Sequence, residues 1–256
     1  MAEPVVTYRS EGSVAVITLN RPEKLNAINP AMCEALRGAF ERLQAGEDRV
    51  GILTGAGTRA FTAGADVNDV PQLWRCVPGV GVALDKPLIA AVRGHAVGQG
   101  CELAGVCDLT IASETARIGE IQIRHGYPPP ILITPYLVGQ KQAKELLLLG
   151  EAADAQDALR LGLVNRVVPD GELEAAAEAM AKKLAALPPN TVRLNKLLVN
   201  RVYELAGLRG AMAWADDAAL RALWKSEDAV AAERHRVRNE QGWAAFKQER
   251  DQGYRQ

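Results

Sequence analysis

The chain has 256 residues, 48% of them hydrophobic and 24% charged, which is ordinary for a globular protein with a sizeable buried core. Its 30 basic and 31 acidic residues nearly balance, so the charge gives no sign of a surface for nucleic acid or for an anionic membrane. The N-terminal stretch has neither a basic nor an apolar region, and no apolar run is long enough to span a bilayer. We therefore expect no secretory signal and no membrane partner.

The first two-thirds of the chain alternates strand-like and helix-like segments. The Val- and Ile-rich residues 13–19 predict a strand. Asn29 followed by Pro30 is typical of an N-cap and a first helical residue, and hydrophobic residues then recur every three or four positions, so residues 30–44 are predicted to be helical. Further short buried strands are expected at residues 50–53, 88–92 and 109–112.

From about residue 134 onward the pattern is almost entirely helical, with one strand-like interruption at residues 163–168. Asp154 and Gly162 are predicted to cap and stop a short helix. Residues 171–187 predict another, Asn190 is expected to cap a third, and a long polar helix is expected beyond Ser226. The sequence thus predicts an α/β body followed by a helical C-terminal part.

The most unusual stretch runs from residue 86 to residue 108, where an apolar segment leads into a glycine-rich turn and a helix predicted to begin near residues 98–100. Such a turn exposes free backbone N–H groups at a helix N-terminus, where partial positive charge collects. This arrangement can hold an anion or a developing oxyanion. Glu102 falls in the first turn, and this stretch alone leaves open whether it only complements the helix dipole.

A second small-residue loop, residues 60–67, follows the predicted strand at 50–53. The small residues Ala63, Gly64 and Ala65 allow a ligand to approach the backbone closely. The N–H group of Ala65 is a candidate second donor. Composition alone is equally compatible with a tight loop packed on the core.

Other common sites find no support in the sequence. The third glycine of a dinucleotide-binding fingerprint would fall at Leu103, and the chain has neither a nucleophile-elbow serine motif nor a P-loop. His95, His125 and His235 are scattered, and the four cysteines lack paired metal-ligand spacing. We expect no metal and no bound cofactor, and the cysteine usage favours the reduced cytoplasm.

Five stretches together carry a family resemblance. Residues 20–27 (NRPEKLNA), 61–66 (FTAGAD) and 98–104 (GQGCELA) are similar to three ordered motifs of the enoyl-CoA hydratase/isomerase (crotonase) family. Residues 144–149 and 158–167 also look like crotonase sequence. The resemblance covers nearly the whole chain, and several motifs in order are far more specific than any one of them.

The resemblance implies an α/β spiral of ββα units with C-terminal helices that build a trimer, often a dimer of trimers. Residues 1–190 would form the acyl-CoA-binding core and residues 191–256 the helical, oligomerising region. An acyl-CoA thioester would place its carbonyl between the N–H groups of Ala65 and Gln99, which stabilise a developing enolate more than the ground state. The residues implied to contact substrate or coenzyme A are Lys24, Leu25, Ala27, Ala63, Gly64, Asp66 and Val67.

A hydratase of this family uses two glutamates to hold a water and deliver its proton to the α-carbon. Glu102 matches one of them. The other lies in a motif that usually ends Gly-Gln-Pro-Glu, where this chain has Gln122 at the last position and Glu120 two residues earlier. An amide binds water but does not take up a proton at neutral pH. If the segment is extended, Glu120 and Gln122 share a face with Cα atoms about 6.5 Å apart, and whether Glu120 substitutes stays open.

Three further departures point to a changed acyl pocket or altered chemistry. Gln99 replaces a usual glycine and can still donate its N–H if the backbone does not need positive φ. The segment between Asp66 and Lys86 is shorter than is common, and residues 127–130 (YPPP) replace a glycine-rich turn.

The default function that the resemblance implies is therefore hydration of a 2-enoyl-CoA. Isomerisation, decarboxylation or thioester hydrolysis on the same fold remains open, since an oxyanion hole serves any enolate or tetrahedral intermediate. Because of Gln122, a non-catalytic acyl-CoA-binding protein also remains open.

Overall fold

Two sheets organise the computed structural model, which describes residues 3–69, 84–226 and 228–251. The larger sheet has the strand order β1-β2-β3-β5-β7-β10, and the smaller one the order β4-β6-β8-β9. In the larger sheet β1 and β2 form an antiparallel hairpin, and the remaining neighbours are parallel. Its strands are Val6–Glu11, Val14–Leu19, Val50–Gly55, Leu88–Val92, Leu109–Ser113 and Arg166–Val168, in chain order.

From β3 to β8, successive strands of the chain alternate between the two sheets. The smaller sheet consists of β4 (Ala60–Thr62), β6 (His95–Val97), β8 (Arg117–Gly119) and β9 (Ala153–Asp154). The chain passes from β3 to β4, from β5 to β6 and from β7 to β8. Each such pair adds one strand to each sheet, parallel to the strand before it in that sheet. After β6 the turn is completed by helix α3 (Gln99–Gly105). The α/β spiral of ββα turns predicted from the sequence is therefore confirmed.

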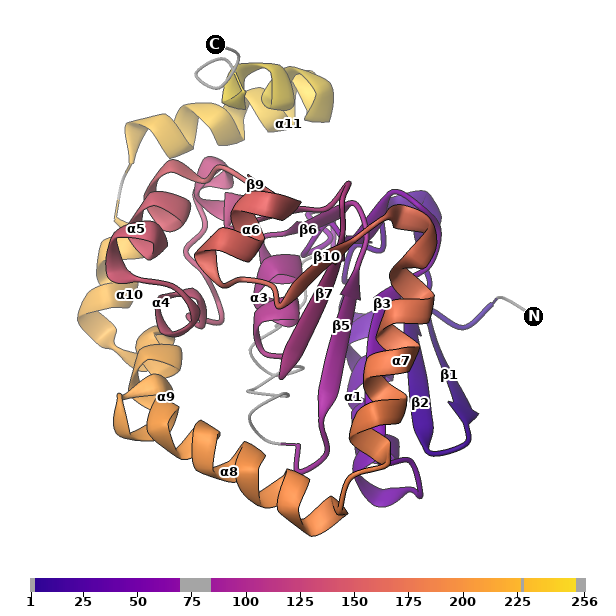
Figure 1. Ribbon diagram of the computed structural model, residues 1–256. Helices are drawn as coiled ribbons and strands as arrows, with labels where there is room; N and C mark the ends of the chain where they lie inside the picture. The colour runs from indigo at the N-terminus through magenta and orange to yellow at the C-terminus, as the bar shows by residue number, and fades with distance from the viewer. Residues whose placement is uncertain (1–2, 70–83, 227, 252–256) are drawn as a thin grey trace.

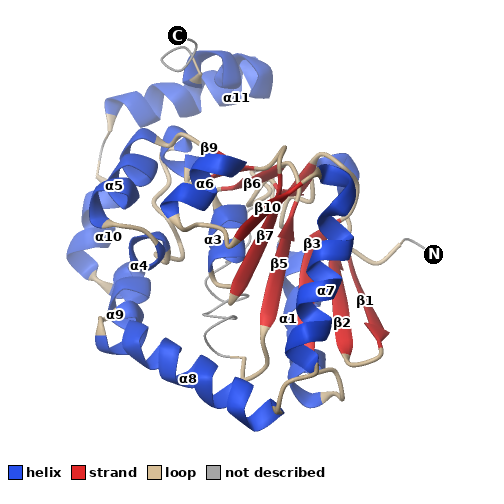
Figure 2. Cartoon of the chain, in the orientation of Figure 1, coloured by secondary structure: helices blue, strands red, loops and turns tan. Residues whose placement is uncertain are grey.

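Helices cover both faces of the larger sheet (Figure 2). Helix α7 (Leu173–Ala185) packs on one face, against side chains that include Ile52 and Ile89. Helix α1 (Pro30–Ala45) and α3 belong to the core cluster that contains the alternate side chains of the same strands, such as Leu88 and Ala90. Because a strand presents successive side chains to opposite faces, β5 is apolar throughout and fully buried.

Local capping signals set several helix boundaries. The side chain of Asn29 accepts a hydrogen bond from the N–H of Met32, so α1 begins at Pro30 as predicted. Asp154 and the left-handed Gly162 bracket α6 (Ala155–Leu161), also as predicted. The prediction for Asn190 is wrong. Helix α8 (Pro189–Leu205) begins one residue earlier, since a proline suits the first helical position.

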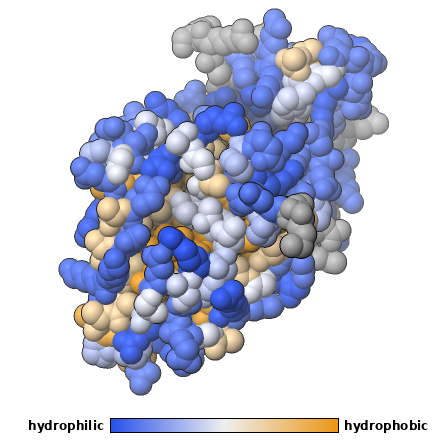
Figure 3. Space-filling model, turned by 90° about the vertical axis from the view of Figure 1, so that its right-hand side faces the viewer, coloured by the Kyte–Doolittle hydropathy of each residue, from blue (hydrophilic) through white to orange (hydrophobic). Residues whose placement is uncertain are grey.

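The C-terminal third is mostly helical. Helix α8 crosses the lower end of the molecule and α11 (Ala229–Arg250) lies at the top, broken at Gly242 (Figure 1). In Figure 3 this upper part is mostly hydrophilic in colour, in keeping with the long polar helix expected there. The remaining helices are α4 (Thr134–Leu137), α5 (Gln140–Leu149), α9 (Leu208–Met212) and α10 (Ala218–Lys225), with 3-10 turns η1 (Pro22–Lys24), η3 (Ile121–His125), η4 (Asp170–Glu172) and η5 (Ala213–Asp216).

No helix within the described ranges is both long and apolar enough to cross a membrane. The division of the chain into regions 1–190 and 191–256 stays a prediction.

Candidate active site

The first motif of the site is held by a buried asparagine. Leu25 and Asn26 adopt left-handed conformations (φ 52° and 54°), which cost energy for residues other than glycine. Asn26 is fully buried, and its side chain accepts from the N–H of Arg21 (2.9 Å). It also donates to the carbonyls of Ala56 (3.0 Å) and Ala60 (2.9 Å). These bonds stabilise the turn and fasten it to β4.

The second small-residue loop is fixed on both sides of Ala65. The hydroxyl of Thr62 accepts from the N–H of Gly64 (3.1 Å), and the N–H of Ile28 donates to the Gly64 carbonyl (2.8 Å). The N–H of Asp66 donates to the Ile28 carbonyl (2.8 Å). Within the described ranges, the N–H of Ala65 has no hydrogen-bond partner. It is therefore available to a ligand.

The glycine-rich turn lies directly against this loop. A Cβ atom on Gly64 would lie 3.1 Å from the Gln99 nitrogen, and one on Gly100 only 2.4 Å from the Thr62 carbonyl oxygen. The Gln99 N–H also lacks a partner in the part of the chain that the structure describes. Leu25 and Asn26 are the only non-glycine residues with positive φ among those described, so a side chain at Gln99 strains nothing. The structure thus brings together the two loops that carry Ala65 and Gln99.

Glu102 lies in the first turn of α3 and is fully buried. Its Oε1 atom lies 3.4 Å from Nε2 of Gln122, while its Oε2 atom has no partner among the described residues. Burial raises the pKa of Glu102 well above its usual value, and the nearby Glu120 raises it further. A backbone hydrogen bond with Ile131 opposes this rise. A raised pKa makes the carboxylate of Glu102 a stronger base than an exposed one.

The segment from Glu120 to Gln122 is not extended, so the condition for a spacing of about 6.5 Å between their Cα atoms does not apply. Glu120 precedes the 3-10 helix η3, which turns Gln122 back toward it, and Gln122 Nε2 donates to Glu120 Oε2 at 2.8 Å. The hydroxyl of Thr134 donates to the other oxygen of Glu120. Burial raises the pKa of Glu120 to about 7, against the lowering effect of these two hydrogen bonds.

The orientation of the Gln122 amide follows from these partners. Its nitrogen faces the two carboxyl groups, and its oxygen would lie 3.5 Å from a Cβ atom on Gly98. The side-chain oxygens of Gln122 and Gln99 are both buried and without a partner within the described ranges. Unpaired buried oxygens are rare in folded proteins and are typical of places where water or a ligand binds.

The other predicted substrate contacts flank these loops. Lys24 is exposed, whereas Leu25, Ala27 and Ala63 are half-buried. The carboxylate of Asp66 is already engaged by the guanidinium of Arg21 (3.1 Å). Their contacts with coenzyme A stay a prediction.

Sequence reasoning missed the residues that hold the site. Arg238 on α11 donates from Nη2 to the carbonyl of Val67 (2.6 Å), across 171 residues of sequence. Thr134, which binds Glu120, was also missed. For Asn26, the motif at residues 20–27 could have been examined for a left-handed turn, since asparagine tolerates positive φ better than most residues. Nothing local signals Arg238.

Comparison with known proteins assigns the family. A family model described as enoyl-CoA hydratase/isomerase matches residues 9–251. The chain belongs to the enoyl-CoA hydratase/isomerase family. This family member is 37% identical over 212 residues to a short-chain-enoyl-CoA hydratase of Clostridium acetobutylicum, covering 77% of this chain and 81% of the relative. It is 39% identical over 228 residues to a probable enoyl-CoA hydratase of Rhizobium meliloti, covering 82% and 86%.

A solved structure supports the same assignment. The enoyl-CoA hydratase/isomerase of Xanthobacter autotrophicus is 33% identical and superposes with a TM-score of 0.87, covering 96% of this chain and 97% of that one. The family and the crotonase-type fold predicted from the sequence are both confirmed.

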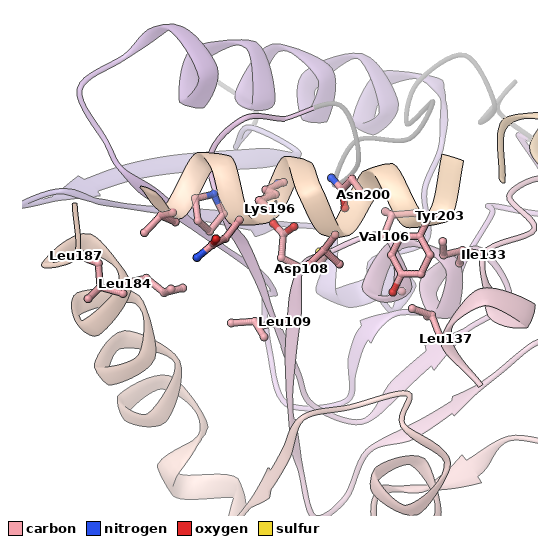
Figure 4. Close-up of a pocket in the computed structure, with 16 residues that line it drawn as sticks. Val106, Asp108, Leu109, Ile133, Leu137, Leu184, Leu187, Lys196, Asn200 and Tyr203 are labelled. Carbon is pink, nitrogen blue, oxygen red and sulfur yellow. Dashed lines mark hydrogen bonds and ion pairs between the residues drawn. The ribbon is translucent and has the colours of Figure 1, made fainter. Parts of the chain in front are cut away.

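This hydratase/isomerase family member also has a cavity of about 340 Å³ away from the predicted residues, beneath α8 (Figure 4). Its lining is mainly apolar and includes Leu109, Leu137 and Tyr203. Lys196 and Asp108 form an ion pair there (2.7 Å), and Lys196 also donates to the carbonyl of Lys86 (2.9 Å). The cavity adjoins the C-terminal end of α3, opposite the end that carries Gln99, so it is distinct from the candidate active site.

Proposed function

We propose that the protein hydrates a 2-enoyl-CoA thioester. The observation that carries the proposal is Glu102, a fully buried carboxyl with one unpaired oxygen, beside two contacting loops whose Ala65 and Gln99 amides are unpaired in the described part of the chain. Membership of the enoyl-CoA hydratase/isomerase family supports it. The thioester carbonyl binds the two amides, which stabilise negative charge as the enolate forms.

One carboxyl group is sufficient for a balanced addition of water. Ionised Glu102 removes a proton from the water molecule while the water oxygen bonds to C3 of the enoyl group. This addition gives the enolate. Neutral Glu102 then returns that proton to C2, so the carboxylate is regenerated. Gln122 holds the water through its amide oxygen, since it carries no transferable proton. Glu120 accepts from the Gln122 nitrogen and thereby keeps the amide oxygen turned toward the reaction.

The test is a spectrophotometric assay of the purified protein with 2-enoyl-CoA thioesters of several chain lengths, without added metal or cofactor. We expect the conjugated-thioester absorbance to fall, and Glu102→Gln to lower the rate by about 10²–10⁴-fold. Binding of acyl-CoA without turnover of any thioester would contradict the proposal and favour a non-catalytic binding protein. A Glu102→Gln variant as active as the parent would remove Glu102 from the mechanism.

Gln122 favours one second candidate, isomerisation of a 3-enoyl-CoA. A proton shift from C4 to C2 needs one base that returns the same proton, and Glu102 is the group with a free carboxylate oxygen here. The same assay run with 3-enoyl-CoA thioesters separates the two reactions, because isomerisation creates the conjugated absorbance that hydration removes.

We further propose that the protein forms a homotrimer or a dimer of trimers and acts in the cytoplasm. A stripe of exposed large apolar side chains on α8 supports an interface between copies, because monomers rarely expose so many together. The stripe consists of Leu194, Leu197, Leu198, Val199, Val202 and Leu205. Size-exclusion chromatography with light scattering tests it. We expect Leu198→Glu to shift the mass toward the monomer.

A further inference from the structure

The C-terminal helix α11 touches two segments of the candidate active site, the Ala65 loop and η3, the short helix that carries Gln122. On one side, Arg238 Nη2 donates to the carbonyl oxygen of Val67 at 2.6 Å. Val67 is two residues beyond Ala65, the proposed oxyanion donor. A guanidinium bonded to a carbonyl oxygen makes a charge-assisted hydrogen bond, which is stronger and more directional than a neutral one.

Arg238 completes a clamp around Ala65. Main-chain hydrogen bonds join Ile28 to Gly64 and Asp66, the two neighbours of Ala65. The Asp66 side chain is fixed by Arg21 at 3.1 Å, with both side chains largely buried. Among the described residues beyond Asp66, the hydrogen bond from Arg238 to Val67 joins the loop to α11. Its loss leaves Val67 without this anchor.

Trp243 links Arg238 to η3 through His125. The Arg238 guanidinium lies 5.4 Å from the centre of the Trp243 ring, and His125 stacks with the same ring at 6.0 Å with an interplanar angle of 4°. Phe246 stacks on both rings. The break at Gly242 (φ 84°) directs the chain into this arrangement, and a side chain there would be strained.

His125 ends η3, the short helix that carries Gln122. Its Nε2 atom pairs with Nη1 of Arg250 at 2.7 Å, and since arginine only donates, Nε2 accepts. The ring also makes a hydrogen bond with the backbone of Ile121, at the start of η3. Arg234 donates to the carbonyl of Arg124 (3.2 Å). Helix α11 therefore fixes the position of η3 at several points.

We propose that Arg238 and Trp243 are positioning residues, which hold the Ala65 loop and the Gln122 helix at one fixed separation. Neither residue touches the reacting atoms. They act through Val67 and His125, and the inference rests on the proposed function of the site. A displacement of about 1 Å in such a site costs on the order of 10²-fold in rate.

The test compares Arg238→Met with Arg236→Met. Arg236 lies on the same helix but binds only Glu233 and Glu240 within the described ranges, so it is a matched control. We expect Arg238→Met to lower kcat by about 10–100-fold, with the dissociation constant of unreactive butyryl-CoA changed less than twofold. Arg236→Met should match the parent in both. Arg238→Lys should recover part of the kcat, because its ammonium still donates to Val67.

Hydrogen exchange measured by mass spectrometry gives a readout that does not depend on turnover. Amides in peptides covering residues 60–67 and 117–127 should exchange faster in Arg238→Met and Trp243→Ala than in Arg236→Met. Unchanged exchange in both peptides overturns the inference, whether or not the proposed function holds. A rise in the butyryl-CoA dissociation constant that matches the loss of kcat/KM also overturns it, since Arg238 would then only bind ligand. Failure of the parent to turn over any enoyl-CoA rejects the proposed function alone.

Discussion

The side-chain nitrogen of Gln122 lies 2.8 Å from Oε2 of Glu120 and so keeps an uncharged donor at a buried carboxyl group. The same nitrogen approaches Glu102 at 3.4 Å. Two buried carboxyl groups that face each other repel when ionised, and a shared amide donor reduces that cost. The order Glu-x-Gln at residues 120–122 is therefore compatible with a stable site.

An exchange of these two residues tests this arrangement. Gln122→Glu alone removes the donor and adds a third carboxyl group, so we expect the free energy of unfolding at pH 7 to fall by about 2 kcal/mol. The double variant Glu120→Gln/Gln122→Glu restores one donor and one acceptor and should recover most of that loss. Urea unfolding and kcat, measured for the parent, the two single variants and the double variant, check this prediction. A double variant no more stable than the single one would show that the two side chains are not coupled.

Contact between the two loops makes a prediction about Gly100. A methyl group there would meet the carbonyl oxygen of Thr62 at 2.4 Å, so Gly100→Ala must push the two loops apart. We expect kcat to fall by about 10²-fold, measured in the enoyl-CoA assay. Gly38→Ala is the control, because a methyl group on Gly38 meets nothing within 4 Å and suits the helix interior. Equal activity of the two variants would contradict the close packing of the loops.

His125 makes stability depend on pH. Burial first, and the charge of Arg250 second, lower its pKa from 6.5 to about 4. The unfolded imidazole takes up a proton near pH 6.5 and the folded one only near pH 4. The stabilisation that comes from keeping His125 neutral is therefore fully present above pH 6.5. As the pH falls toward 4 it is lost, which lowers the free energy of unfolding by up to about 3 kcal/mol.

The comparison of parent and His125→Gln isolates this effect from other titrating groups. We expect the parent to lose more stability than the variant between pH 7 and pH 4, as measured by urea unfolding at each pH. Parallel stability curves for the two proteins would mean that the imidazole is not held neutral.

Removal of the cation from the ion pair beneath α8 should lower the stability of the protein without directly affecting the reaction. Lys196→Met leaves the half-buried Asp108 without its cation, and breaking such a pair costs up to about 3–5 kcal/mol, the range for fully buried pairs. Arg201→Met on the same helix is the control, because Arg201 is exposed and pairs only with nearby Glu204 among the described residues. Thermal unfolding compares them, and a Lys196 variant as stable as the control would contradict a structural role for the pair.

Much of the fold was predictable because its signals are local. The cap at Asn29, the buried strand β5 and the start of α3 each follow from a few neighbouring residues. The loops that carry Ala65 and Gln99, which the family motifs singled out, do lie against each other. Where two local signals compete, prediction failed, and Pro189 rather than Asn190 decided the start of α8.

The relation between Glu120 and Gln122 was not predictable because it depends on distant parts of the chain. The 3-10 turn that joins them is supported by Thr134 and by α11, through contacts with His125. For the three residues directly after β8, an extended conformation is the simpler expectation. No local pattern distinguishes it from a tight turn that packing with the rest of the chain stabilises.

The contact between Val67 and Arg238 also bears on how this protein is made. Its two ends are 171 residues apart, so the bond forms only after the chain as far as Arg238 has left the ribosome. Nascent chains that stop before α11 would contain the strands and the acidic residues of the site but lack this bond. We expect ribosome-bound intermediates to acquire their sheets well before they acquire full catalytic competence.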